Sequence, residues 1–322
     1  MEVMVSISDD TGMIGLEERP ALEAFPHETR LLRDGLLQRW GKFTLRLERC
    51  QAELSEENIH DLRVSMRRLL AMLVMCRAVM PELKTKGLRR EIKSHLDNLD
   101  ALRDTHVMQL YLKKHLRKNE SVVPLETFLA MQETHLLRQL GYDIYRIFPG
   151  KMSEKINALC MSLEHSLTGT GVAGQILAVV DEAYANVFWR QVNIDPSNLA
   201  SVHAMRIAFK KFRYMLEVAS PLVPPMPPSR PRVMHHYQGM MGDIQDVVVM
   251  LAFIDRFAAE NPQFDVSPVR AIVVQKLDER MAYFLGRINR LKQFWRKSPT
   301  TRFPWRVSIM EPSSVIQEDE EE

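Results

Sequence analysis

The chain has 322 residues, of which 46% are hydrophobic and 26% charged, and these values near the globular average exclude wholesale disorder. The longest apolar run, Val247 to Ile254, has eight residues, far short of the roughly 20 that a membrane helix needs. Three widely spaced cysteines argue against a disulfide framework or a cysteine-based zinc site. Because the N-terminus also lacks the pattern of a signal peptide, we predict a cytoplasmic protein without a membrane segment.

The net charge of +2 is unevenly distributed. The last five residues, Glu318 to Glu322, are all acidic, so the rest of the chain carries +7. A terminal run of like charges is typical of a tail, and we expect one here. The mildly basic body favours an anionic partner.

Apolar residues recur at helical spacing along nearly the whole chain, and no strand-like alternation bounded by turns appears. Proline-rich and glycine-rich stretches separate the periodic segments. The fold class is therefore expected to be all-α. The expected helices span roughly residues 27–53, 57–80, 87–118, 124–147, 152–166, 174–192, 198–219, 230–260 and 267–297.

A segment of the first half reappears in the second. At a shift of 143 residues, 59–69 aligns with 202–212, and at a shift of 142, 102–104 aligns with 244–246. We therefore predict an internal duplication that gives two pseudo-symmetric helical bundles. The predicted divisions are an N-terminal extension (1–24), repeat one (25–149), repeat two (150–300) and an acidic tail (301–322).

The repeated helix carries basic residues beside its apolar stripe. At about 100° per residue, a histidine and several cations share one polar stripe in each copy. These stripes are His60, Arg63 and Arg67 in the first copy, and His203, Arg206, Lys210 and Arg213 in the second. Cations four residues apart repel one another by roughly a few tenths of a kcal/mol in a helix. Since both halves repeat this unfavourable spacing, we interpret the stripes as an anion-binding surface.

The histidines and two aspartates allow more than one interpretation. His60 and His203 can donate a ring N–H to an anion, or they can be ordinary hydrogen-bonded structural residues. Asp104 and Asp246 also occur at matching places. We interpret them as acids that orient a neighbouring arginine or histidine, and catalytic acids are the alternative.

Two further basic stripes occur outside the repeated helix. Lys86, Arg89 and Lys93 flank the apolar stripe of the third segment. Near the C-terminus, aromatic residues and cations alternate at helical spacing. The members of this second stripe are Arg280, Tyr283, Arg287, Arg290, Phe294 and Lys297. They would stack on nucleic-acid bases, or place aromatics in the core and cations at its rim.

The pattern H-x-x-R-x-x-x-R-R from His60 to Arg68 resembles the first signature of the CHAD family, the conserved histidine α-helical domain. The run from His203 to Glu217 resembles its second signature, and Leu102-Arg103-Asp104 resembles its leucine/arginine/aspartate segment. The likeness extends from about residue 25 to 297. It implies non-catalytic binding of inorganic polyphosphate in a basic cavity, with no cofactor or metal, in the cytoplasm and at polyphosphate granules. The residues expected to bind are His60, Arg63, Arg67, Arg68, Lys93, His203, Arg206, Lys210, Lys211 and Arg213, with Asp104 and Asp246 behind them.

Two other functions remain as alternatives. A metal-dependent phosphohydrolase is suggested by the adjacent pairs His60-Asp61 and His235-His236, although Ala204 follows the histidine of the second repeat. A single-stranded nucleic-acid binder is the other alternative. Aromatic residues make up only 7% of the chain and no nucleic-acid motif is present, so nucleic acid is the less favoured partner.

Overall fold

The computed structural model describes residues 27–116, 120–166 and 171–305, and within them every regular element is helical. The expected all-α class is confirmed. The α-helices are α1 (His27–Ala52), α2 (Glu56–Val79), α3 (Lys86–Asn98), α4 (Asp100–His115), α5 (Val123–Tyr145), α6 (Gly150–Ser166), α7 (Val172–Val192), α8 (Leu199–Ala219), α9 (Arg230–Glu260) and α10 (Ser267–Leu285). Short 3-10 helices are η1 (Glu120–Val122), η2 (Ser220–Leu222) and η3 (Ile288–Gln293). The extension predicted for 1–24 and the five terminal acids lie outside the described residues.

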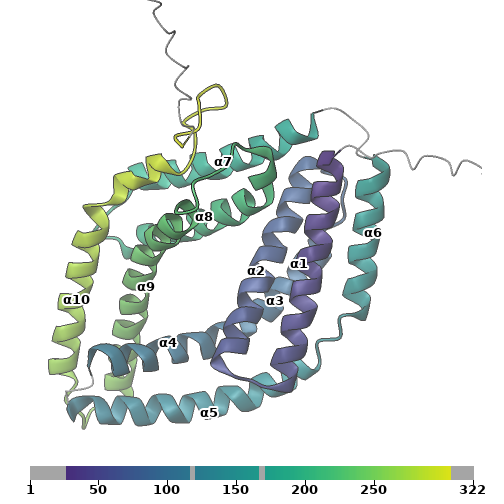
Figure 1. Ribbon diagram of the computed structural model, residues 1–322. Coiled ribbons are helices and arrows are strands. Elements are labelled where there is room, and N and C mark those ends of the chain that lie inside the picture. Colours follow the sequence, from purple (N-terminus) through teal and green to yellow (C-terminus); the bar gives the residue numbers. More distant parts are fainter. Residues whose placement is uncertain (1–26, 117–119, 167–170, 306–322) are drawn as a thin grey trace, which may run out of the picture.

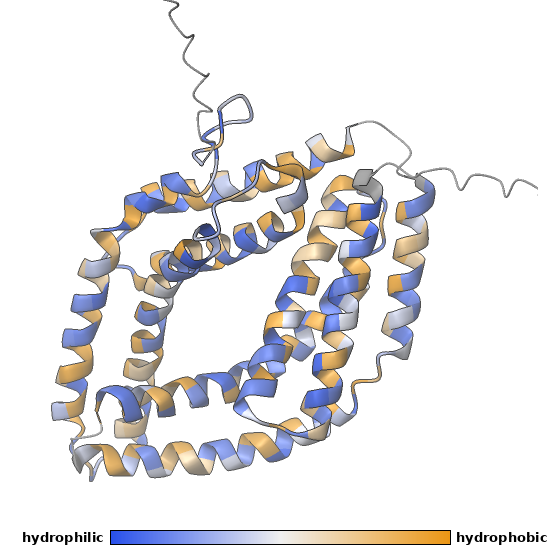
Figure 2. Ribbon diagram, viewed as in Figure 1, coloured by the Kyte–Doolittle hydropathy of each residue, from blue (hydrophilic) through white to orange (hydrophobic). Residues whose placement is uncertain are grey.

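The helices are amphipathic, with hydrophilic and hydrophobic residues interspersed along each one (Figure 2). Side chains fix where α2 and α8 begin. The Ser55 hydroxyl accepts a hydrogen bond from the Asn58 amide at 3.2 Å, and the Asn198 side chain accepts one from the Ala200 amide at 3.1 Å. None of the described helices is long and apolar enough to cross a membrane.

Antiparallel helix pairs form a frame (Figure 1), in which α1 packs on α2, α7 on α8, α9 on α10 and α4 on α5. Two apolar clusters hold the frame together. The larger joins α1, α2 and α3 to α6, α7 and α8, and the smaller joins α4 and α5 to α9 and α10. Both clusters contain helices from before and after the boundary at residue 150. The core therefore combines residues of the two predicted repeats.

Two helices are shorter than their periodicity suggested. The segment 87–118 divides at Leu99 into α3 and α4. Leu96, Leu99 and Leu102 are all buried, so the apolar spacing continues across the break and conceals it. At the other end, α10 stops before Gly286, whose amide bonds to the Ala282 carbonyl at 3.0 Å. Glycine at a helix C-terminus is a common stop signal.

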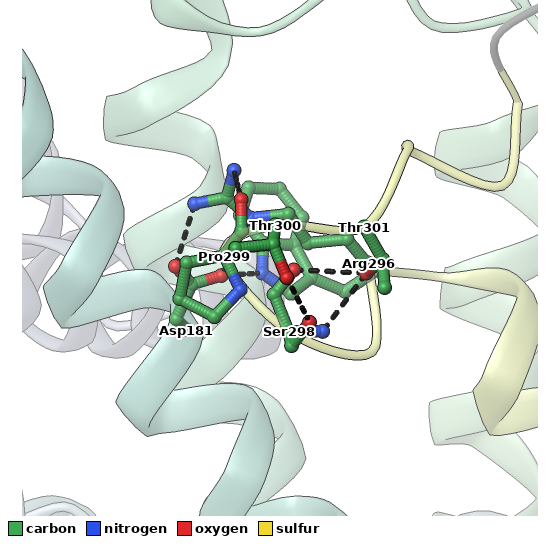
Figure 3. A network of polar contacts seen from close by, with 7 residues as sticks. Asp181, Arg296, Ser298, Pro299, Thr300 and Thr301 are labelled. Carbon is green, nitrogen blue, oxygen red and sulfur yellow. Dashed lines mark hydrogen bonds and ion pairs between the residues drawn. The ribbon is translucent and has the colours of Figure 1, made fainter.

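The described structure continues past the predicted boundary at residue 300. Trp305 is buried, packs on Trp295 and donates its ring N–H to the Pro224 carbonyl at 3.1 Å. The preceding loop is held to α7 by Asp181, whose carboxylate accepts bonds from the Arg296 guanidinium at 2.6 and 2.9 Å (Figure 3) and from the Trp295 ring N–H at 2.6 Å. Residues 301–305 therefore belong to the folded body and not to an acidic tail.

Replacing Asp181 with alanine should lower the free energy of unfolding by about 3 kcal/mol, because Arg296 would keep a largely buried charge without a partner. Urea denaturation measures this loss. The matched control is Asp255→Ala on α9, which removes an exposed ion pair with Arg270 of α10. This substitution should cost less than about 1 kcal/mol. Equal effects of the two substitutions would contradict the anchoring role of Asp181.

Candidate functional site

A cavity of about 1160 Å³ lies between α2, α3, α4, α8 and α9. This volume exceeds the upper end of the usual range for small-molecule pockets, roughly 1000 Å³. Eleven cationic side chains line the cavity, against three acidic ones. The cations are Arg63, Arg67, Arg77, Lys86, Arg89, Arg90, Lys93, Arg103, Arg206, Lys210 and Lys211, and the acids are Asp100, Asp104 and Asp246. Such an imbalance makes the cavity attractive to anions.

Helical spacing brings these cations to the cavity and keeps their neighbours in the core. On α2, Arg63 and Arg67 line the cavity while Met66 is fully buried. On α8, Arg206 and Lys210 line it. The side chains behind them on α8, such as Phe209 and Phe212, are fully buried in the larger apolar cluster. The cations therefore emerge from the margins of packed helices, which fixes their positions.

Three half-buried cations of α2 and α8 line the cavity without an ion pair to a described residue. Arg67, Arg206 and Lys210 are half-buried, and none forms a hydrogen bond or ion pair with any other described residue. The Nε atom of Arg206 is buried without a partner, and its guanidinium packs over Gly242, leaving 3.6 Å to the place where a Cβ atom would lie. Buried charges are normally paired, so this group presents an unsatisfied demand for an anion.

The pKa values reflect this concentration of positive charge. Burial, followed by repulsion from Arg67 and Arg206, lowers the pKa of the Lys210 ammonium to about 7. Burial also lowers the pKa of the Arg67 and Arg206 guanidinium groups. Burial raises the pKa of the Asp246 carboxyl, although Arg206 opposes the change. Lys210 is therefore the cation of this group whose charge is most sensitive to a bound anion.

Arg63 differs from its neighbours because its charge is compensated. It is 4% exposed, donates to the Asp100 carboxylate at 2.6 Å and contacts the Leu96 carbonyl at 3.4 Å. We expected Asp104 to provide such orientation. Instead, the carboxylate that pairs with Arg63 belongs to Asp100, one helical turn before Asp104. Asp104 lines the cavity without a hydrogen bond or ion pair to any described residue.

His203 lines the cavity as expected, and its Nδ1 atom lies 2.5 Å from the Gln245 side-chain oxygen. Gln245 therefore orients this histidine, a role that the sequence analysis gave to Asp246. Asp246 lines the cavity beside Arg206 without bonding to a described residue. Lys93 lies at the exposed edge of the cavity and pairs with Asp97 at 2.6 Å.

Three of the expected binding residues do not line the cavity. His60 lies in a separate pocket with several glutamates, and burial, then Arg103, lowers its pKa. Arg68 donates two hydrogen bonds to Glu217 at 2.9 and 3.3 Å, which ties α2 to α8. Arg213 bonds to the Gln238 side chain at 2.8 Å on α9. The two arginines thus serve packing between helices.

Arg77, Arg90 and Arg103 line the cavity although they are not among the binding residues predicted from the sequence. A signal for Arg77 was present, because it continues the cavity-facing row of α2. Arg103 lies within the repeated Leu-Arg-Asp segment, in which only the aspartate was predicted to act at the site. Arg90 follows the predicted stripe residue Arg89, so α3 presents a broader basic face than its spacing suggested.

The features that suggested other functions are separated in the structure. Asp61 pairs with Arg46 at 2.8 Å, and His236 packs edge-on against Tyr283. Among the described residues, no three histidine, cysteine or carboxylate side chains are grouped as a metal site would require. All three cysteines are buried with free thiols.

The C-terminal basic and aromatic stripe is interrupted by the end of α10. Phe294 lies in the core, beyond η3, while Arg287 stacks over Tyr283 with its guanidinium carbon 3.7 Å from the ring centre. The two aromatic rings therefore do not form one continuous stacking surface. Core aromatics with cations at the rim describe this region better than a platform for bases.

Fold and site together define an all-α protein with a strongly cationic cavity. The family model for the CHAD domain matches residues 24–255, most of the chain, and the protein belongs to the CHAD domain family. A crystal structure of the CHAD domain from the plant Ricinus communis has a similar fold, with a TM-score of 0.67. The two share 18% identity over 84% of this chain and 94% of the plant chain. None of the curated proteins matches the chain.

Proposed function

We propose that the protein binds inorganic polyphosphate in this cavity and does not turn it over. The observation that carries the proposal is the group formed by Arg67, Arg206 and Lys210, three half-buried cations without a hydrogen bond or ion pair among the described residues. A bound anion would supply what the fold leaves unsatisfied. Membership of the CHAD family and the resemblance of the two signatures support the same ligand.

Polyphosphate fits the chemistry of the lining. It carries dense negative charge and no bases, so its recognition needs rows of cations and little else. Arginine offers a fork for two phosphate oxygens, and lysine offers a compact charge. We call Arg67, Arg206 and Lys210 the inner group. The cations on α3, such as Arg89 and Arg90, would extend contact along the polyphosphate beyond it. We also propose a cytoplasmic location at polyphosphate granules as the setting for this binding.

An internal duplication would explain why two helices supply cations to one cavity. We infer that α2 and α8 are equivalent helices of a duplicated unit, each contributing one row of cations to the same cavity. A long anion would then contact both halves of the protein at once. A second contact made by an already bound chain benefits from a high effective concentration, which short phosphates cannot exploit.

Calorimetric titration with polyphosphate of defined length and with pyrophosphate tests the function. We expect the long chain to bind much more tightly than pyrophosphate. Its affinity should also fall steeply between low and high salt, because displaced counterions drive the association, by analogy with nucleic acid. Similar affinities for both phosphates, or release of orthophosphate during the titration, would contradict the proposal.

A further inference from the structure

We propose that Lys210 is a site of acylation by acyl phosphates, the mixed anhydrides of a carboxylic acid and phosphoric acid. The inference rests on the proposed function in one respect, namely that the cavity attracts phosphate groups. It adds a reaction at one residue and a means of changing the affinity of the site.

The surroundings of Lys210 are suited to holding the phosphate part of such a reagent. Arg63 and Arg67 face it from α2, Arg206 lies one turn away on α8, and Asp100 on α4 is the acid that acts on it. Arg63 is already bonded to Asp100, whereas Arg67 and Arg206 are free to bind phosphate oxygens. The Lys210 amine makes no hydrogen bond or ion pair with a described residue, so its lone pair is not occupied.

The amine is also nucleophilic near neutral pH. Because its pKa is about 7, roughly half of the side chain is unprotonated at pH 7, against a few in ten thousand for an ordinary lysine of pKa about 10.4. Desolvation and neighbouring cations are the established ways of activating a lysine nucleophile. Both operate here, from burial and from Arg67 and Arg206.

The reaction needs no further reagent. The neutral amine nitrogen attacks the carbonyl carbon of the acyl phosphate, a C–N bond forms, and the bond from that carbon to the bridging oxygen breaks. The phosphate leaves with that electron pair and takes up the proton that the nitrogen loses. The products are an amide and inorganic phosphate, with nothing oxidised or reduced. Arg67 and Arg206 would stabilise the negative charge on the departing phosphate.

Acylation would remove one positive charge from the inner group and add an uncharged side chain to the cavity. Polyphosphate would then bind more weakly, because the contact made by the ammonium is lost. The same modification would relieve the repulsion among Arg67, Arg206 and Lys210 in the free protein. Acyl phosphates would in this way set how much of the protein is able to bind polyphosphate.

Incubation of the full chain with acetyl phosphate at pH 7, followed by mass spectrometry of each lysine, tests the proposal. The matched internal controls are Lys93 and Lys211, which line the same cavity and are exposed. We expect Lys210 to be acetylated roughly tenfold faster or more, given its larger neutral fraction. A rate at Lys210 no higher than at Lys93 and Lys211 would overturn the proposal.

A second set of measurements separates this inference from the proposed function. In the Arg67→Gln, Arg206→Gln variant, acetylation of Lys210 should slow towards the rate of Lys211, since the repulsion from the two arginines and their binding of the phosphate are both lost. Unchanged acetylation there would contradict the mechanism. Added polyphosphate should protect Lys210 in the unmodified protein. Fast acetylation of Lys210 without such protection would support the reaction and contradict polyphosphate binding, while protection of a slowly reacting Lys210 would do the reverse.

Discussion

Replacing Arg67 and Arg206 together with glutamine should weaken the binding of a long polyphosphate chain about a hundredfold or more. Each charge-assisted hydrogen bond in a sheltered site contributes roughly 1.5–3 kcal/mol, and about 1.4 kcal/mol corresponds to a tenfold change in affinity. Both guanidinium groups line the cavity without a protein partner, so their loss acts on the bound state. Isothermal titration calorimetry of the variant measures the change, and the salt slope should also decrease.

The same variant should be no less stable than the unmodified protein. Removing two mutually repelling, half-buried cations relieves an unfavourable interaction, so the free energy of unfolding should stay constant or rise. The matched control removes the same charge from exposed positions of α1 outside the cavity, by Arg30→Gln and Lys42→Gln. An equal loss of affinity in the control, or a destabilised cavity variant, would show that the two arginines serve folding or bulk electrostatics.

Polyphosphate affinity should fall about tenfold between pH 6 and pH 8. Lys210 has a pKa of about 7 in the free protein, and a bound polyanion favours its ammonium form. Below pH 7 the ammonium is already present and the affinity is level. Above pH 7, binding must take up a proton, so the affinity declines as the pH rises. Titrations in buffers of different ionisation enthalpy should reveal this proton uptake directly.

The Lys210→Arg variant is the control for the pH effect, because an arginine at this position keeps its charge across the range. Its affinity should vary with pH much less than that of the unmodified protein. If both proteins lose affinity in parallel, another group governs the pH dependence. The charged groups facing Lys210 are Arg63, Arg67, Arg206 and Asp100.

The all-α class and most helix boundaries could be predicted from local sequence, because helical periodicity and caps such as Asn198 are encoded within a few residues. The break at Leu99 could not, because apolar spacing continues through it. The core shared by the two predicted repeats could not be predicted either. Periodicity identifies which face of a helix is buried, but not which helix covers it, and α6 packs on α1 across the predicted repeat boundary.

Several cations of the candidate site could be predicted from the sequence, but the acids that pair with neighbouring arginines could not. Arg67, Arg206 and Lys210 were identified because unfavourable like-charge spacing is visible in sequence, and the structure gives them no local relief. Arg63 carries the same spacing but pairs with Asp100, and Arg68 beside Arg67 pairs with Glu217, both acids from elsewhere in the chain. Such pairs join residues 37 and 149 positions apart, and only the tertiary fold brings them together.

The most direct test of the account is a crystal structure of the protein with a polyphosphate chain of defined length. We expect a continuous run of phosphate groups in the cavity, with oxygens within hydrogen-bond distance of Arg67, Arg206 and Lys210 and the run continuing towards the basic residues of α3. The pair between Arg63 and Asp100 should remain intact. A phosphate chain bound elsewhere on the surface, with the cavity empty, would contradict the account.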